Sequence, residues 1–164
     1  MKLYLVQHAK AVSDQADPQR PLTEEGRSDI QKVAVFIKPL NLCVDYLWHS
    51  GKKRAEQTAE VLAKVVKVNK AVNARNGLGP TDDVMALKDE LVSATEDIMV
   101  VGHLPFLSKL TSLLLTSSEP RPSERGEGES ANTVAFKNAG IVALNRSDKN
   151  QWQIDWMIIP ELLA

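Results

Sequence analysis

Short apolar runs alternate with longer amphipathic segments over the first two thirds of this chain. The runs at residues 3–6, 44–48 and 98–101 have the length and composition of buried strands. Between them, apolar residues such as Ile30 and Val33 recur at helical spacing. Strands that are joined by helices need crossover connections. This order therefore predicts a three-layer α/β fold, with a mostly parallel, mixed sheet and helices on both faces.

The same pattern sets the expected boundaries of each element. We expect strands at residues 2–7, 44–48, 70–73 and 97–101, and helices at residues 23–38, 53–66, 82–93 and 105–115. Thr23 is a suitable N-cap for the first helix, and Pro39 ends it because proline cannot donate the next helical hydrogen bond. Pro105 opens the last of these helices, where its missing N–H costs nothing.

The last third of the chain is expected to complete the sheet. Residues 133–137, 141–145 and 153–159 are predicted strands, the first two forming a hairpin at a mixed edge. Residues 116–130 are rich in Ser, Pro, Glu and Gly and are predicted to form a mobile surface loop. A chain of 164 residues without an internal repeat or a linker predicts one domain, residues 1–164.

The charge balance argues against nucleic acid or an anionic membrane as a partner. The chain has 20 basic and 21 acidic residues, a net charge of −1, and no apolar segment of membrane-spanning length. The start of the chain has too few apolar residues for a signal peptide. The single cysteine, Cys43, cannot form an internal disulfide or a cysteine metal cluster. We expect a cytoplasmic monomer.

Polar residues suited to phosphate chemistry follow three of the expected strands. His8 follows the first strand, Arg54 the second, and His103 lies in Gly102-His103-Leu104-Pro105 after the strand at 97–101. The carboxyl ends of parallel strands meet at one edge of a sheet, where α/β proteins bind ligands. An imidazole can attack phosphorus, and a guanidinium at a helix N-terminus suits a phosphate. His103 could donate to a phosphoryl oxygen as charge builds in the transition state.

Taken one at a time, these residues have structural explanations. Either histidine could sit at a strand end or cap a helix, and Lys52, Lys53 and Arg54 could form a solvated basic turn. We expect the two lysines to face solvent. His49 also follows a strand, next to Ser50, but no partner residue in the sequence points to a role for it.

Five stretches in one order resemble a known superfamily. They are Leu5-Val6-Gln7-His8, Arg20-Pro21-Leu22-Thr23 with Gly26, residues 50–58, Leu78-Gly79-Pro80 with Asp83, and Val101-Gly102-His103-Leu104-Pro105. Together they resemble the histidine phosphatases, the phosphoglycerate-mutase-like superfamily, and within it the small SixA-type phosphohistidine phosphatases. Arg54-Ala55-Glu56-Gln57-Thr58 is the most specific local match.

The resemblance implies roles for particular residues. His8 would be the nucleophile that becomes phosphorylated, Arg54 and His103 would bind the phosphoryl oxygens, and Arg20 would fill the extra arginine position of the SixA branch. Ser50 would also bind phosphate. The resemblance implies no metal and no organic cofactor, because positioning and fixed positive charge would do the work. The expected partner is a protein that carries phosphohistidine.

The first motif departs from the superfamily pattern. The pattern is Arg-His-Gly, and this chain has Gln7-His8-Ala9. Gln7 can donate a hydrogen bond to phosphate but carries no charge, and the loss of one transition-state donor costs roughly 3 kcal/mol. Lys10 follows two residues after His8, and we hypothesise that its ammonium group binds phosphate and restores part of the missing charge.

Three functions remain open from the sequence. The first is a phosphatase for protein phosphohistidine, whose P–N bond breaks easily once its nitrogen is protonated and so needs little acid catalysis. The second is a phosphatase for small phosphate esters, in which Asp82 or Asp83 would act as the acid. The third is a degenerate member that binds phosphate or a phosphoprotein without turnover, an alternative that Gln7 and Ala9 motivate.

Overall fold

Hydrogen bonds between strands join the apolar runs into one six-stranded sheet. In the computed structural model, which describes residues 1–116 and 134–164, the strand order is β3-β2-β4-β1-β5-β6. The strands are β1 (Lys2–Gln7), β2 (Cys43–His49), β3 (Lys67–Ala74), β4 (Ile98–Gly102), β5 (Ile141–Arg146) and β6 (Trp152–Ile158). The pairs β2–β3, β2–β4 and β1–β4 are parallel, whereas β1–β5 and β5–β6 are antiparallel. The expected mostly parallel, mixed sheet is confirmed.

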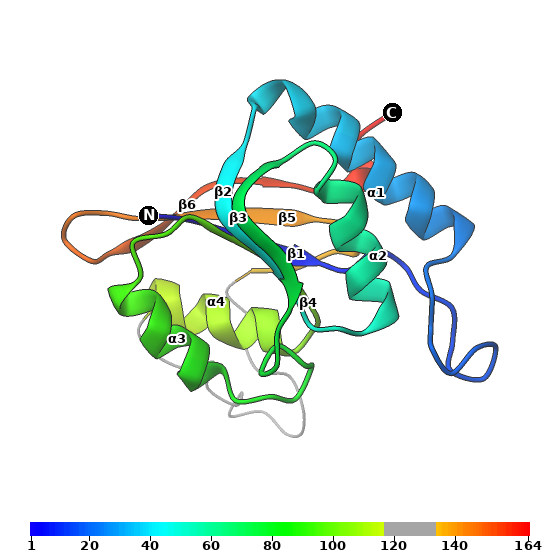
Figure 1. The fold of residues 1–164 in the computed structure, drawn as a ribbon, viewed down its shortest axis with the longest axis horizontal. Helices are drawn as coiled ribbons and strands as arrows, with labels where there is room; N and C mark the ends of the chain where they lie inside the picture. The colour runs from blue at the N-terminus through cyan, green and yellow to red at the C-terminus, as the bar shows by residue number, and fades with distance from the viewer. Residues whose placement is uncertain (117–133) are drawn as a thin grey trace, which may run out of the picture.

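Helices cover both faces of this sheet (Figure 1). They are α1 (Glu24–Ile37), α2 (Lys53–Leu62), α3 (Val84–Ser93) and α4 (Phe106–Thr116), with short 3₁₀ turns at Lys38–Leu40 and Pro160–Leu162. Side chains alternate along β1, so Tyr4 and Val6 pack with α1 and α2 while Leu3 and Leu5 pack with α3 and α4. The result is the three-layer architecture expected from the sequence.

Side-chain caps set where two of the helices begin. Thr23 caps α1, accepting a 2.9 Å hydrogen bond from the backbone N–H of Gly26. Asp83 caps α3 in the same way through the N–H of Met85. Among the described residues, no helix combines the length and apolar character that a membrane crossing requires.

Three expected elements differ from those in the structure. Helix α2 ends at Leu62 rather than at residue 66, because the backbone turns there to enter β3. β3 is longer than the expected strand at residues 70–73. Residues 134–137 are not a strand, although Val134 and Phe136 are buried against the α3 and α4 side of the core.

The terminal hairpin therefore has different members from those predicted. It consists of β5 and β6, and the chain reverses between Ser147 and Gln151. Of the expected loop at residues 116–130, Thr116 is the last residue of α4. Residues 117–130 of that loop, and residue 133 of the expected strand, lie outside the described residues.

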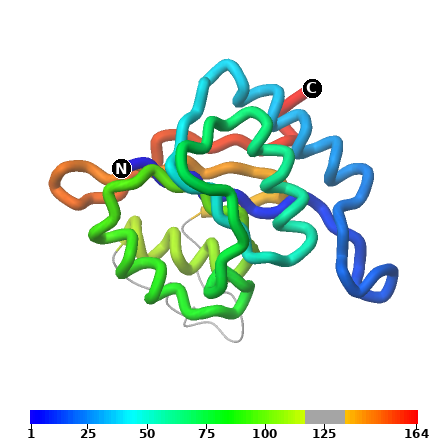
Figure 2. Tube along the Cα trace, in the orientation of Figure 1, coloured from blue at the N-terminus to red at the C-terminus, as the bar shows by residue number. Residues whose placement is uncertain are grey.

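Register places the ends of three parallel strands level with one another. Gln7 of β1 lies opposite Gly102 of β4, and His49 of β2 lies opposite Val101 of β4. The residues that follow each strand therefore emerge at the same edge of the sheet. Figure 2 shows the segment between β1 and α1, in dark blue, projecting from the body of the molecule.

Candidate active site

Two histidine rings meet where β1 and β4 end. The His8 and His103 ring centroids are 5.0 Å apart, and the ring planes are inclined by 53°. The backbone N–H of His8 donates a 3.0 Å hydrogen bond to the carbonyl of Gly102, which holds the two strand exits together. His103 is buried and His8 is partly buried, so both rings are largely shielded from water.

Hydrogen-bond partners define the protonation of the His8 ring. Nδ1 lies 2.7 Å from the carbonyl oxygen of Ala9, which can only accept, so Nδ1 carries the hydrogen. Nε2 receives a 3.2 Å hydrogen bond from Nε–H of Arg54, so Nε2 carries the lone pair. The ring therefore presents an unprotonated nitrogen to the guanidinium group.

Both imidazoles are held in the neutral form. Burial lowers the pKa of His8 from 6.5 to about 4, assisted by the charges of Arg54 and Arg20 and opposed by the hydrogen bond to Ala9. Burial is also the main cause that lowers the pKa of His103 to about 3. The nearby His8, Arg54, Lys52 and Arg20 add smaller effects in the same direction. A neutral imidazole is the nucleophilic form.

Helix α2 positions Arg54 and ties two other segments to it. Thr58 Oγ1 accepts a 3.0 Å hydrogen bond from the backbone N–H of Ala9 and donates one of 2.7 Å to the carbonyl of Arg54. Gln57 Oε1 accepts a 2.8 Å hydrogen bond from the N–H of Leu22. Positions 54, 57 and 58 share one face of a helix. Thr58 and Gln57 therefore bond to the two ends of the segment between β1 and α1, on the same side of α2 as Arg54.

Ser50 lies against the second histidine. Its Oγ is 2.5 Å from Nε2 of His103, and it accepts a weaker 3.4 Å hydrogen bond from the N–H of Lys52. Oγ keeps a second lone pair besides the one that faces the Lys52 N–H, so the imidazole tautomer decides whether Ser50 or His103 donates across this contact. Nδ1 of His103 is buried and has no partner among the described residues.

Arg20 reaches the site from the segment between β1 and α1. Its backbone is in the left-handed region, with φ of 50°, an uncommon conformation for a residue with a side chain. Its Nε–H donates a 3.0 Å hydrogen bond to the carbonyl of Val12, which leaves the terminal nitrogens for other partners. The charge of Arg20 contributes to the lowered pKa of His8, Arg54 and His103, so its guanidinium group lies near these side chains.

Gln7 and Lys10 are placed differently from the other expected residues. They line a second cavity of about 280 Å³, whose other lining residues are Glu25, Asp29, Phe136, Lys137, Asn138 and Glu161. The ammonium group of Lys10 lies 2.5 Å from Glu25 Oε2 and is exposed. The structure thus pairs the Lys10 ammonium group with a carboxylate of α1, and its role in place of the missing charge at position 7 stays a prediction. Gln7 Oε1 is buried without a partner among the described residues.

Two polar residues that support the site were not anticipated from the sequence. Asn138 Nδ2 donates a 2.9 Å hydrogen bond to the carbonyl of His8. His49 is buried, and its Nδ1 accepts a 3.2 Å hydrogen bond from the N–H of Gly51 in the turn that carries Ser50. The Asn138-Ala139-Gly140 turn signal was visible, but it does not reveal that the turn lies beside residue 8, 130 positions earlier.

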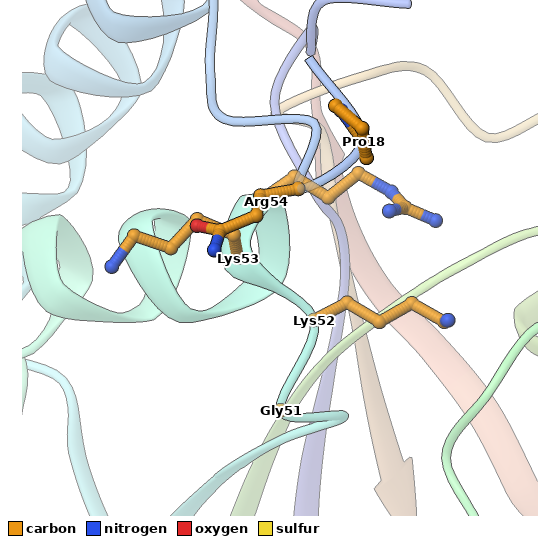
Figure 3. A pocket seen from close by; sticks show the side chains of 6 residues that line it. Pro18, Gly51, Lys52, Lys53 and Arg54 are labelled. Carbon is orange, nitrogen blue, oxygen red and sulfur yellow. The ribbon is translucent and has the colours of Figure 1, made fainter. Parts of the chain in front are cut away.

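A cavity of about 340 Å³ opens beside Arg54. It is lined by Pro18, Gln19, Gly51, Lys52, Lys53 and Arg54 (Figure 3). Within residues 1–116 and 134–164, no three His, Cys, Asp or Glu side chains are grouped so that they could hold a metal ion. His8 and His103 are not among the residues that line this cavity, and the positive charges of Lys52 and Arg54 favour a bound anion there.

Comparison with known proteins shows which family this chain is similar to. The sequence model of the histidine phosphatase superfamily, branch 1, matches residues 3–79, a range that contains His8, Arg20 and Arg54. Phosphohistidine phosphatase SixA of Escherichia coli (strain K12) is 26% identical over 165 residues, covering 98% of this chain and 94% of that protein. The chain is therefore similar to the histidine phosphatase superfamily over residues 3–79.

Solved structures share the fold of this chain. A protein histidine phosphatase SixA bound to tungstate superposes with a TM-score of 0.81 at 22% identity, and each chain is covered in full. A phosphoserine phosphatase from Entamoeba histolytica, in complex with 3-phosphoglyceric acid, gives a TM-score of 0.66 at 18% identity, with 95% of each chain covered. The phosphoglycerate-mutase-like fold expected from the sequence is confirmed.

Proposed function

We propose that this protein is a phosphatase of the histidine phosphatase superfamily that removes the phosphoryl group from phosphohistidine on a protein partner. The observation that carries the proposal is the neutral His8 ring, whose Nε2 lone pair points toward Arg54 beside a second neutral imidazole. In this proposal the chain acts as a single-domain, cytoplasmic monomer and needs no metal.

The first step transfers the phosphoryl group to His8. Nε2 of His8 attacks phosphorus, and the bond between phosphorus and the partner's imidazole nitrogen breaks. That imidazole takes a proton from solvent and leaves as the neutral ring. The terminal nitrogens of Arg54 and Arg20, together with His103, stabilise the charge on the phosphoryl oxygens.

The second step returns His8 to its starting form. Water attacks phosphorus as the bond between phosphorus and Nε2 breaks, and the released proton goes to solvent with inorganic phosphate as the product. Ser50 holds His103 in place during both steps through the contact between Oγ and Nε2. The hydrogen bond from Nδ1 of His8 to Ala9 keeps the ring orientation unchanged.

The surroundings of the acidic residues support phosphohistidine over phosphate esters. Asp82 accepts a 2.7 Å hydrogen bond from the N–H of Gly79, and Asp83 caps α3. Both carboxylates thus have structural partners, which disfavours either one as the acid that an alkoxide leaving group needs. The relative from E. coli is a phosphohistidine phosphatase by name.

The test is to trap the phosphorylated enzyme. The protein is mixed with a ³²P-phosphohistidine carrier protein, quenched in denaturant and assayed for acid-labile, alkali-stable label, with His8→Asn as the control. We expect label on wild type alone and hydrolysis of phosphohistidine but not of sugar phosphates. Hydrolysis without label on residue 8 would overturn the mechanism. Phosphate binding without any turnover would instead support the degenerate binding member.

A further inference from the structure

Two adjacent lysines at the start of α2 have different surroundings. Both are exposed and both line the cavity beside Arg54. The Lys53 ammonium lies 3.0 Å from Glu56 Oε2, one turn along the same helix. Lys52 takes part in none of the ion pairs formed within the described residues. One of two neighbouring charges is therefore neutralised and the other is not.

The directions of the side chains agree with this difference. In Figure 3 the side chains of Lys52 and Arg54 extend to the same side, away from α2, whereas Lys53 extends the opposite way along the helix. Arg54 is the guanidinium that contacts His8. The free ammonium group of Lys52 is thus directed toward the side of the molecule on which phosphate would bind.

The backbone of Lys52 is connected to the second histidine. Its N–H donates to Ser50 Oγ at 3.4 Å, and that oxygen lies 2.5 Å from Nε2 of His103. The charge of Lys52 is also one of the causes that lower the pKa of His103. A short turn therefore keeps this lysine close to the imidazole, and its four-carbon side chain can move toward a bound ligand.

The negative charge of a phosphoryl group can be stabilised by a further cation at this site. A phosphoryl group carries close to two negative charges near neutral pH. The two imidazoles are neutral, and Gln7 contributes no charge. Lys10 is paired with Glu25. Arg54 and Arg20 balance the ground state, and Lys52 is the remaining unpaired cation on this lining that can meet charge building on the oxygens.

We propose that the ammonium group of Lys52 binds a phosphoryl oxygen of the substrate and acts as a third cation of the active site. The inference rests on the proposed function, because it assigns the phosphoryl group to the pocket between His8, Arg54 and His103. The added contact comes from the turn after β2, and not from Gln7-His8-Ala9, where the superfamily pattern has its arginine. No bond is made or broken by Lys52 itself.

The test compares Lys52→Ala with Lys53→Ala, a matched loss of charge one residue away. Tungstate and inorganic phosphate are the binding probes in calorimetry, and free phosphohistidine is the substrate, because it has no neighbouring protein groups. We expect Lys52→Ala to weaken tungstate binding and lower kcat/KM by roughly fivefold, the upper range for an exposed ion pair. Lys53→Ala should match wild type, and Lys52→Arg should restore most of the loss.

Each remaining outcome has a definite meaning. If Lys52→Ala binds tungstate as tightly as wild type and hydrolyses free phosphohistidine at the same rate, the inference is wrong. A defect seen only with a phosphorylated protein would also overturn it, since Lys52 would then contact the partner's surface. If wild type binds tungstate but hydrolyses no phosphohistidine, the proposed function fails, while the binding comparison still decides the role of Lys52.

Discussion

The Nε–H of Arg54 points at Nε2 of His8 across 3.2 Å, while Nδ1 of the same ring faces the carbonyl of Ala9 at 2.7 Å. One nitrogen is therefore committed to the backbone, and the other is free to react when a ligand draws the guanidinium away. We predict that the trapped intermediate carries phosphorus on Nε2. ³¹P and ¹⁵N NMR of the quenched enzyme distinguishes the two nitrogens, and phosphorus on Nδ1 would contradict the assigned tautomer.

Stability should depend on pH through the two imidazoles. The folded-state pKa values of His8 and His103, about 4 and 3, lie below the usual value of 6.5, so the unfolded chain binds more protons as the pH falls. Their contribution is complete above pH 6.5 and is lost as the pH falls through the folded-state values. For His8 the lowered pKa corresponds to a change on the order of 3 kcal/mol in the free energy of unfolding.

Urea unfolding at intervals between pH 7 and 4 measures this dependence. Wild type should lose stability steadily toward pH 4, and His8→Asn should lose less because it has no group to protonate at that position. An equal slope in both proteins would show that His8 is not held neutral by the fold.

Thr58 should contribute to both stability and turnover. Thr58→Val keeps the shape of the side chain but leaves the buried N–H of Ala9 without an acceptor. We expect a loss of about 1–3 kcal/mol in unfolding free energy, together with lower kcat, because Ala9 adjoins His8. Thr58→Ser retains the hydroxyl and is the matched control. Valine and serine variants with equal activity would rule out this anchoring role.

Gly26 should tolerate no side chain. A Cβ there would lie 2.1 Å from the carbonyl oxygen of Lys10, so the start of α1 and the segment after His8 would have to separate. We predict that Gly26→Ala loses about 2 kcal/mol, in the range of overpacked sites, although alanine favours helices. Ser28→Ala, exposed on the same helix, controls for helix propensity in chemical denaturation. A stabilised Gly26→Ala would show that the close approach is not required.

His49 should act through the turn that carries Ser50. Its Nδ1 accepts from the N–H of Gly51, a residue with φ of 84°. His49→Leu removes that acceptor and should cost about 1 kcal/mol and weaken tungstate binding, whereas His49→Asn offers an amide oxygen near the same place and should retain both. If the leucine and asparagine variants bind tungstate equally well, the turn does not depend on this hydrogen bond.

Most of the fold could be predicted where the burial of side chains and the hydrogen bonding of the backbone favour the same element. β1, β2 and β4 are buried apolar runs, and α1 has both a cap at Thr23 and an apolar stripe, so local and long-range forces agree. The expected strand at residues 133–137 failed because Val134 and Phe136 alternate like strand residues but only fill the core, without a ladder partner in the described chain. Alternation reports which side chains are buried and not which backbone groups are paired.

The candidate site was predictable where residue type and strand ends coincide. His8, Ser50, Arg54 and His103 come together because register aligns β1, β2 and β4 at one edge. The position of the Lys10 side chain could not be predicted, because it depends on Glu25 in a helix whose distance from β1 only packing determines. For the same reason the sequence did not reveal that Asn138 bonds to the backbone of His8, or that His49 bonds to that of Gly51.

Two hydrogen bonds to α2, one from Ala9 to Thr58 and one from Leu22 to Gln57, fasten the segment between β1 and α1 at its two ends. Between them, residues 13–17 do not line the cavity beside Arg54, so we expect this part of the segment to accept sequences of other length or charge. Grafting new sequences there offers a way to change which partners the proposed phosphatase acts on, while the His8 ring keeps its alignment.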